Sequence, residues 1–220
     1  MDNLDSTEDD YRALRSAVAD GVVDIADLTP GQTGNLSARD GERLAITPSG
    51  VPYAEIERGD VPVVGVDGER LVGDLEPSSE LAMHLELYRA LQPGAIVHVH
   101  APYSTTLAVE RRPVPSIHYM LAAAGGAVPV APYEPFGTPE LAEAVSTTME
   151  EAGTTACLLA NHGLVATGED VSGALETAIA VESTARLAVQ ADDPVELSDE
   201  QLSTAIEQFT SYGQGVEKSR

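Results

Sequence analysis

Apolar residues recur along the chain with two different periods, and these periods predict its helices and strands. From Leu81 to Leu91 they follow a helical spacing, and Ser78 precedes them as a candidate helix N-cap. Thr138 and Pro139 mark another helix start, as its cap and its first residue. The helical period predicts helices over 11–20, 79–91, 104–111, 138–153, 171–191 and 199–213. Extended apolar runs predict strands over 43–50, 61–74, 94–101, 126–133 and 156–168.

The segment 31–41 interrupts this pattern with glycine and asparagine, so no regular element is predicted there. Hairpin-like strand pairs alternate irregularly with helices in the rest of the chain. This arrangement predicts an α/β fold with a mixed or largely antiparallel sheet and helices packed on it. The length of 220 residues, without a visible linker or repeat, fits one domain over 1–220, with 1–10 and 213–220 as mobile tails.

The charge balance changes the partners and surroundings expected for this fold. The chain has 36 acidic and 12 basic residues, which gives a formal net charge of −24. Nucleic acid and anionic membranes would be repelled, so neither is an expected partner. The acidic residues lie among apolar periodic segments, which predicts a folded protein with an acidic, solvated surface. Such a surface is typical of a halophilic protein in a high-salt cytoplasm, where salt screens the self-repulsion.

Cysteine usage and hydropathy favour a cytoplasmic location. The single cysteine, Cys157, lies in an apolar run, so we expect a buried strand residue and no intrachain disulfide. The acidic segment 1–10 lacks the apolar stretch of a signal peptide. No run approaches the roughly 20 apolar residues of a membrane-spanning helix. We therefore expect a cytoplasmic protein.

Two of the five histidines, His98 and His100, stand one residue apart at the end of an apolar run. Side chains alternate along a strand, so both imidazoles share one face while the valines beside them face the core. Such a pair offers a metal two ligands, but the same pattern also describes partly buried structural histidines. His162 adds a third imidazole at a tight turn that can approach another strand. Three histidines at strand ends are the number used by a catalytic metal with an open position.

Three polar motifs add candidate anion-binding groups. In PSSE, Ser78 and Ser79 lie at a predicted helix start, where free backbone amides and hydroxyls bind phosphate. Glu80 follows them, either as a favourable charge at the helix dipole or as part of a site. The motifs GNLS and TPSG are similar to oxyanion cradles. Their candidate residues are Gly34, Asn35, Ser49 and Gly50.

Taken together, eight motifs resemble the class II aldolase/adducin family. In chain order they are GNLS, TPSG, PSSE, HVH, IHYM, AAAGG, FGT and NHG, within about residues 31–190. The resemblance implies a single three-layer α/β domain whose central, mainly antiparallel sheet lies between helical layers. It implies a homotetramer with active sites at subunit interfaces. It also implies reversible cleavage of a ketose 1-phosphate, of the L-fuculose 1-phosphate type, to dihydroxyacetone phosphate and a small aldehyde such as L-lactaldehyde.

The resemblance further implies a metal centre. His98, His100 and His162 would ligate Zn²⁺ or another divalent metal, and Glu80 would serve as a fourth ligand and as the catalytic acid/base. The chemistry agrees, because cleavage leaves negative charge that enzymes stabilise with a lysine Schiff base or a Lewis-acidic metal. The only lysine of the sequence, Lys218, lies near the C-terminus, which leaves the metal route.

Two tyrosines and a phosphate site complete the roles that the resemblance implies. Tyr119 of IHYM would cross a subunit interface to handle the proton on the aldehyde oxygen, and Tyr212 of TSYG would be catalytic in the C-terminal tail. The substrate phosphate would bind to Gly34, Asn35, Ser49, Gly50, Ser78 and Ser79. His84, four residues after Glu80, is expected to be structural, with a supporting role beside Glu80 as the alternative. Asn161 is expected to shape the turn before His162.

Three related functions remain as alternatives. Ribulose-phosphate 4-epimerases typically have aspartate where Glu80 stands, so PSSE favours an aldolase. Methylthioribulose-phosphate dehydratases place an acid near the position of Tyr119, and IHYM argues against them. A non-catalytic, adducin-like binding domain would lack the metal ligands that are present here.

Overall fold

Among residues 11–212, which the computed structural model describes, eight strands form one sheet. They are β1 (Gly34–Asp40), β2 (Arg43–Ile46), β3 (Val63–Gly65), β4 (Arg70–Val72), β5 (Ala95–Val99), β6 (Val130–Ala131), β7 (Ala156–Leu159) and β8 (Gly163–Gly168). Their order is β4-β3-β2-β1-β5-β8-β7-β6, and the β6–β7 pair alone is parallel. The mainly antiparallel sheet is therefore confirmed. The predicted tails 1–10 and 213–220, with Lys218, lie outside the described residues.

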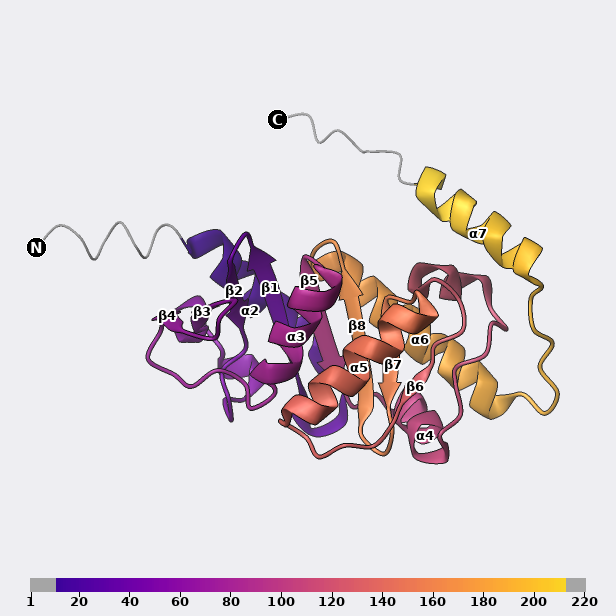
Figure 1. The fold of residues 1–220 in the computed structure, drawn as a ribbon, viewed down its shortest axis with the longest axis horizontal. Coiled ribbons are helices and arrows are strands. Elements are labelled where there is room, and N and C mark those ends of the chain that lie inside the picture. The colour runs from indigo at the N-terminus through magenta and orange to yellow at the C-terminus, as the bar shows by residue number, and fades with distance from the viewer. Residues whose placement is uncertain (1–10, 213–220) are drawn as a thin grey trace, which may run out of the picture.

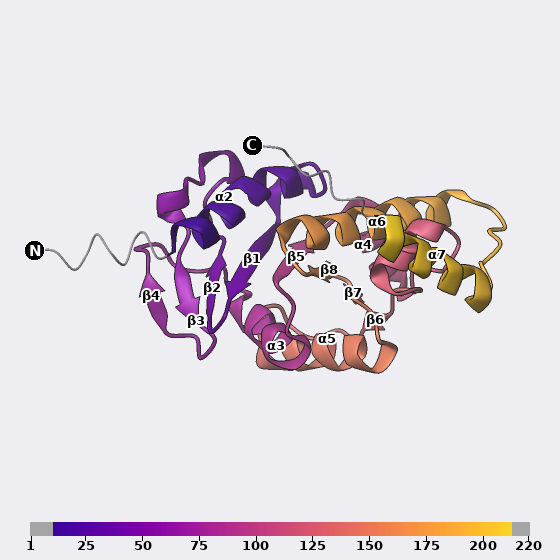
Figure 2. The same ribbon diagram turned by 90° about the horizontal axis from the view of Figure 1, so that it is seen from above.

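Helices cover both faces of this sheet (Figure 1). They are α2 (Arg12–Ala26), α3 (Leu81–Leu91), α4 (Pro102–Glu110), α5 (Pro139–Ala152), α6 (Val171–Gln190), α7 (Asp199–Tyr212) and the 3₁₀ turns η1 (Pro30–Gln32), η2 (Tyr53–Glu55), η3 (Arg58–Asp60) and η4 (Tyr119–Ala124). From above, α2, α4 and α6 lie over one face, and α3 and α5 over the other (Figure 2). A cluster of buried apolar side chains fills each interface. The predicted single three-layer α/β domain is confirmed.

Strand β5 lies near the middle of the sheet and is buried on both faces. Val97 and Val99 point into the core under α6, whereas Ile96 points into the core under α3 and α5. Each fully buried aliphatic side chain stabilises the fold by about 1.5–3 kcal/mol relative to exposure. By the same alternation, His98 shares the face of Ile96 and is fully buried. A buried imidazole is favourable only where it has polar partners, so we expect polar side chains or backbone groups around His98.

Strand β1 corrects the prediction that 31–41 lacks a regular element. It pairs with β2 on one side and with β5 on the other, so it belongs to the centre of the sheet. Leu36 and Ala38 point into the core under α2 and α6. Asn35 and Ser37 point to the other face and form buried hydrogen bonds there. Apolar periodicity missed the strand because hydrogen bonds, and not apolar contacts, satisfy that face.

Two helix starts show how local signals compare with the structure. At α5 the prediction is confirmed, since Thr138 Oγ1 accepts a hydrogen bond from the backbone N–H of Leu141 at 3.2 Å. At α3 the prediction of Ser78 as N-cap is wrong, because the helix begins at Leu81 and Glu80 occupies the N-cap position. Ser78 instead accepts a hydrogen bond from the backbone of Glu80 at 3.3 Å. The shift of two residues places a carboxylate, and not a hydroxyl, at the helix end.

Three other elements differ in extent from their predictions. Helix α2 continues beyond residue 20 to Ala26 through Gly21, where a Cβ would collide with the side chains of Val171 and Leu36. Glycine at this position therefore permits close packing of α2 on the sheet and α6. Helix α4 begins at Pro102, two residues early, and only β6 of the extended segment 126–133 is a strand. None of the helices between residues 11 and 212 is both long and apolar enough to span a membrane.

Candidate active site

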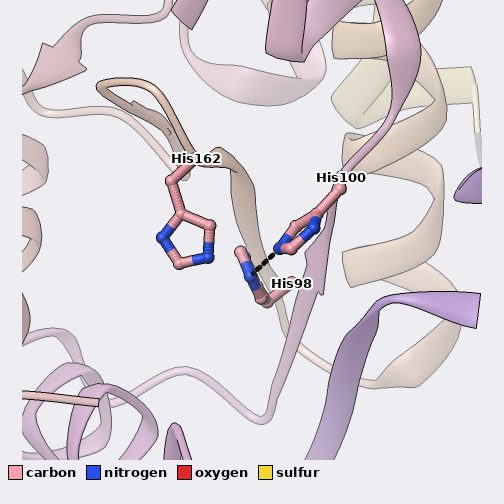
Figure 3. A group of neighbouring side chains, drawn as sticks. All are labelled: His98, His100 and His162. Atoms are coloured by element: carbon pink, nitrogen blue, oxygen red, sulfur yellow. Dashed lines mark hydrogen bonds between the residues drawn. The ribbon is translucent and has the colours of Figure 1, made fainter. Parts of the chain in front are cut away.

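Three histidines meet where the central strands end. His98 belongs to β5, His100 follows that strand, and His162 lies in the turn between β7 and β8. Because β5 pairs antiparallel with β8, the end of β5 lies beside this turn. The three ring centroids are 4.8, 4.9 and 5.0 Å apart, and the rings converge edge to face (Figure 3). One ligand nitrogen from each ring lies within 4.8 Å of the others. The structure thus brings the three predicted ligands together.

Backbone contacts orient these rings. His98 Nδ1 lies 2.9 Å from the carbonyl oxygen of Leu164, which can only accept, so Nδ1 carries a proton and Nε2 is the ring nitrogen directed to the cluster. Asn161 has φ +58° in the turn before His162, as expected for a residue that shapes it. A Cβ at Gly163 would lie 2.6 Å from the carbonyl oxygen of Val99, so glycine is required for this close approach.

Glu80 supplies a carboxylate to the histidine cluster. Its Oε2 lies 3.1 Å from His98 Nε2, and its Oε1 lies 3.5 Å from His162 Nε2. The side chain of Asn35 donates a hydrogen bond to Oε2 at 2.9 Å. Oε1 is buried and has no hydrogen-bond partner among the residues that the structure describes. Both carboxylate oxygens therefore face the cluster, and Asn35 holds one of them, Oε2.

The buried charges of the cluster shift its pKa values. Burial alone would raise the pKa of Glu80, but His98, His162 and Asn35 together hold it well below its ordinary value. Burial lowers the pKa of both His100 and His162 to about 4, and the charge of His98 adds to this effect. For His98, burial is outweighed by the carboxylate of Glu80, which raises the pKa. At neutral pH Glu80 is therefore ionised, and His100 and His162 are neutral.

This donor set fits a divalent metal ion. Neutral imidazole nitrogens and a carboxylate are the ligands that zinc takes in catalytic sites. His98 Nε2 is directed to the cluster, and the buried Oε1 of Glu80 is a polar atom that a cation would satisfy. His98, His100 and His162, together with Glu80, are the residues that would hold the ion.

A cavity of about 680 Å³ opens beside the cluster. His100, His162 and Glu80 line it, while His98 is fully buried behind them. The residues predicted to bind phosphate also line the cavity, from three separate loops or strand ends: Gly34, Asn35, Ser49, Gly50, Ser78 and Ser79. Residues up to 45 positions apart in sequence, Gly34 and Ser79, thus converge on one space next to the metal candidates.

Asn35 has contacts that the sequence did not predict. Besides its bond to Glu80, its Oδ1 lies 2.5 Å from Nε2 of His84, which is fully buried. Nδ1 of the same ring lies 2.6 Å from Ser37 Oγ. His84 is therefore a buried histidine with partners on both nitrogens. The side chain of Asn35 bridges it to the carboxylate of Glu80. Only the spacing of His84 and Glu80 on one helix face hinted at this arrangement.

Of the two predicted catalytic tyrosines, Tyr119 is not part of the cavity lining. Tyr119 begins η4, is 55% exposed, and stacks at a tilt against its neighbour His118. Tyr212 ends α7, and its side chain lies outside the described residues. A single subunit therefore does not bring Tyr119 to the histidine cluster.

Several residues that line the cavity received no role from the sequence, although Phe136 belongs to the motif FGT. Tyr133, Glu134 and Phe136 follow β6 and form part of the cavity wall. The exposed fractions of Tyr133 and Phe136 are 57% and 72%. Tyr53 of η2 also lines the cavity, and burial together with the charge of Glu80 raises its pKa to about 12. The available signal was the pair of aromatic residues in an otherwise polar connection between a strand and a helix.

The fold and the site define a class: a three-layer α/β protein with a carboxylate–trihistidine centre beside a cavity lined by serine, glycine and asparagine. The chain belongs to the class II aldolase/adducin family, because the family profile "Class II Aldolase and Adducin N-terminal domain" matches residues 20–189.

Relatives of known name agree with this assignment. The chain is 39% identical over 215 residues to a 5-methylthioribulose-1-phosphate/5-deoxyribulose-1-phosphate aldolase of Rhodospirillum rubrum, covering 92% of this chain and 96% of the relative. It is 39% identical over 197 residues to an L-fuculose phosphate aldolase of Escherichia coli O6:H1, covering 87% and 90%. The structure of an L-fuculose 1-phosphate aldolase superposes with a TM-score of 0.85 at 38% identity, covering 90% of this chain and 96% of that one.

Proposed function

We propose that the protein is a divalent-metal-dependent aldolase that reversibly cleaves a ketose 1-phosphate to dihydroxyacetone phosphate and a small aldehyde. The observation that carries the proposal is the convergence of Glu80 and the three imidazoles of His98, His100 and His162 on one side of a cavity. The other walls of that cavity hold hydroxyls and backbone amides suited to a phosphate. Both halves of the site are needed for cleavage of a phosphorylated ketose.

The three histidines would hold the metal, zinc or another divalent ion. Bound there, the cation would supply Lewis acidity that stabilises negative charge on the dihydroxyacetone phosphate half of the substrate. The protein's contribution is to orient the ring of His98, whose Nδ1–H donates to the Leu164 carbonyl, and to keep His100 and His162 neutral by burial.

Glu80 would act as the acid/base at the carbon that gains or loses a proton. Its pKa is held low, so the carboxylate is ionised and ready to accept, and Oε1 is the oxygen not bound by Asn35. A positioned carboxylate of this kind contributes about 10²- to 10⁴-fold to a rate.

The phosphate would bind at the rim of the cavity. Ser78 and Ser79 precede α3, and Ser49 and Gly50 lie in the turn after β2, where Gly50 has φ +72°. Backbone amides at a helix start and in a glycine turn donate to anions without needing a cationic side chain. Such donors supply the local positive potential that a chain of formal charge −24 otherwise lacks.

Tyr119 would act in the active site of a neighbouring subunit. It is exposed and lies outside the cavity of its own chain, which supports a homotetramer with shared sites. There it would exchange the proton on the aldehyde oxygen, and Tyr212 would join it from the C-terminal segment.

The acidic surface further supports a halophilic protein of a high-salt cytoplasm.

The aldehyde half distinguishes the candidate substrates. L-Fuculose 1-phosphate is the proposed type, and 5-deoxyribulose 1-phosphate is the second candidate, because aldolases named for each are 39% identical to this chain. Tyr133, Glu134 and Phe136 form the wall that would meet this variable half.

The decisive experiment offers the purified protein a panel of ketose 1-phosphates and measures dihydroxyacetone phosphate, with and without chelator. We expect metal-dependent release of dihydroxyacetone phosphate from at least one of them. An epimerised product would instead indicate an epimerase, and a dehydrated product a dehydratase. A protein that neither binds metal nor turns over any substrate would be an adducin-like binding domain.

A further inference from the structure

A chain of hydrogen bonds connects the core to the carboxylate of Glu80. Tyr88 Oη lies 2.8 Å from Ser37 Oγ, and Ser37 Oγ lies 2.6 Å from Nδ1 of His84. Nε2 of His84 lies 2.5 Å from Oδ1 of Asn35, and Nδ2 of Asn35 donates to Glu80 Oε2 at 2.9 Å. All five side chains are buried. We call this series the Tyr88–Glu80 chain.

Donor and acceptor roles in the Tyr88–Glu80 chain follow from its carboxylate end. A carboxylate only accepts, so Asn35 turns its nitrogen to Glu80 and its oxygen to His84. The amide oxygen also only accepts, so Nε2 of His84 carries a proton. Burial lowers the pKa of His84 to about 3, so the ring is neutral and its Nδ1 accepts from Ser37. Ser37 then accepts from Tyr88, and every bond points toward the carboxylate.

We propose that His84 is a positioning residue, which holds the Asn35 amide with its nitrogen toward Oε2 of Glu80 and so keeps the carboxylate facing the histidine cluster, with Oε1 free of hydrogen bonds from the described residues. A half-turn of the amide would bring Oδ1 against a carboxylate oxygen and remove the acceptor of His84 Nε2–H. The repulsion between the two oxygens and the unpaired N–H are each costly in free energy, because the groups are buried. This positioning role of His84 rests on the proposed function of Glu80, whereas the direction of the hydrogen bonds in the Tyr88–Glu80 chain does not depend on that function.

A purely structural chain would stabilise the fold without influencing the carboxylate, and two matched substitutions separate these roles. His84→Gln keeps an amide nitrogen near the position of Nε2, facing Asn35, and loses the contact with Ser37. His84→Asn keeps a polar atom near Ser37 and is too short to reach Asn35. Both place a neutral amide in the same buried space. Thr184→Val is the control, because it removes a buried hydroxyl bonded to the Ala180 carbonyl at 2.8 Å in α6.

Zinc affinity is the first measurement, by chelator competition on each folded variant. Partners beyond the metal ligands typically contribute 10- to 100-fold to affinity or activity. We expect His84→Asn to weaken zinc binding by about 10-fold or more and to lower kcat more than it raises KM. We expect His84→Gln to retain most of the zinc affinity and most of kcat, although it is no more stable than His84→Asn. Equal effects of His84→Asn and His84→Gln, or values equal to those of Thr184→Val, would overturn the proposal.

The tautomer of His84 is the second measurement, by ¹⁵N NMR of the metal-free wild-type protein. We expect Nε2 protonated and Nδ1 unprotonated, and an unprotonated Nε2 would overturn the proposal. This test needs no variant, so it stands even if His84→Asn does not fold. If wild-type protein binds zinc but cleaves no ketose 1-phosphate, the proposed function fails while the zinc and NMR results still decide the role of His84.

Discussion

The carboxylate of Glu80 lies 3.1 Å from Nε2 of His98, although one residue is the N-cap of α3 and the other is buried within β5. Each group stabilises the charged form of the other. The pKa of Glu80 is therefore held below its ordinary value and that of His98 above it, despite burial that opposes both. This pair marks the point where helix start, strand end and cavity meet.

Replacing Glu80 with glutamine tests its proposed role as acid/base. Glu80→Gln keeps the size of the side chain but cannot accept a proton, so we expect an unchanged fold by circular dichroism and a fall in kcat of about 10²- to 10⁴-fold. Glu86→Gln on the same helix is the control, since Glu86 pairs with Arg89 away from the cavity. A Glu80→Gln enzyme with near-normal kcat would contradict the assignment.

Gly163→Ala tests the close approach of the turn to the histidines. The added Cβ would lie 2.6 Å from the Val99 carbonyl oxygen and 2.9 Å from Cδ2 of His100, so the ring or the strand must move. We expect a loss of stability of about 1–3 kcal/mol, as for other overpacked sites, and weaker zinc binding. Denaturant unfolding and chelator competition measure the two effects. Gly59→Ala, which meets nothing within 4 Å, should change neither.

Acid should destabilise the metal-free protein. Burial lowers the pKa of His84 to about 3 and of His100 and His162 to about 4, all below the ordinary value of 6.5. Between pH 6.5 and 4 the unfolded chain therefore binds more protons at these sites, and stability is lost as pH falls. The raised pKa of His98 contributes stability that is lost only as pH rises above 6.5, so below pH 6.5 it does not offset this loss.

Equilibrium unfolding at pH 7, 6 and 5 measures this dependence, in high salt so that neutralisation of the acidic surface contributes little. We expect the free energy of unfolding to decrease toward pH 5, and to decrease less in His84→Gln, which lacks one of the three groups. A free energy of unfolding that rises toward pH 5 in both proteins would contradict the prediction.

Subunit mixing tests the proposed position of Tyr119 in a neighbouring site. Tyr119→Phe and Glu80→Gln should each be nearly inactive alone. If each site takes Glu80 from one subunit and Tyr119 from the next, random reassembly gives about one quarter of sites with both native residues. Activity of the mixture should therefore recover toward that fraction, with the oligomer mass measured in parallel. A mixture as inactive as its components would place Tyr119 elsewhere.

Salt should stabilise the folded protein if its acidic surface is adapted to a salt-rich cytoplasm. A formal charge of −24 on 220 residues repels itself at low ionic strength, and screening lengths shrink from about 10 Å at 0.1 M to about 3 Å at 1 M salt. We expect Tm to rise steadily from 0.1 to 2 M KCl, by about 2–4 °C for each kcal/mol gained. A Tm that is independent of KCl would remove the halophilic interpretation.

Local patterns were sufficient for much of the fold. Helical periodicity located α3, α5, α6 and α7, and the Thr138 cap was confirmed at the residue. Alternation placed His98 and His100 on one side of β5, because a strand repeats every two residues whatever it packs against. The motifs around these residues were sufficient to recognise the family.

The sequence by itself therefore determined the periodic elements, the family and the residue types of the candidate site. Tertiary structure alone decided that polar 34–40 is a central strand, that Glu80 and not Ser78 occupies the N-cap position of α3, and that Asn35 joins Glu80 to His84. The reason is physical: periodicity records which face of an element is apolar. Hydrogen bonds between residues 45 to 51 positions apart exist only after β1, β5 and α3 have packed together.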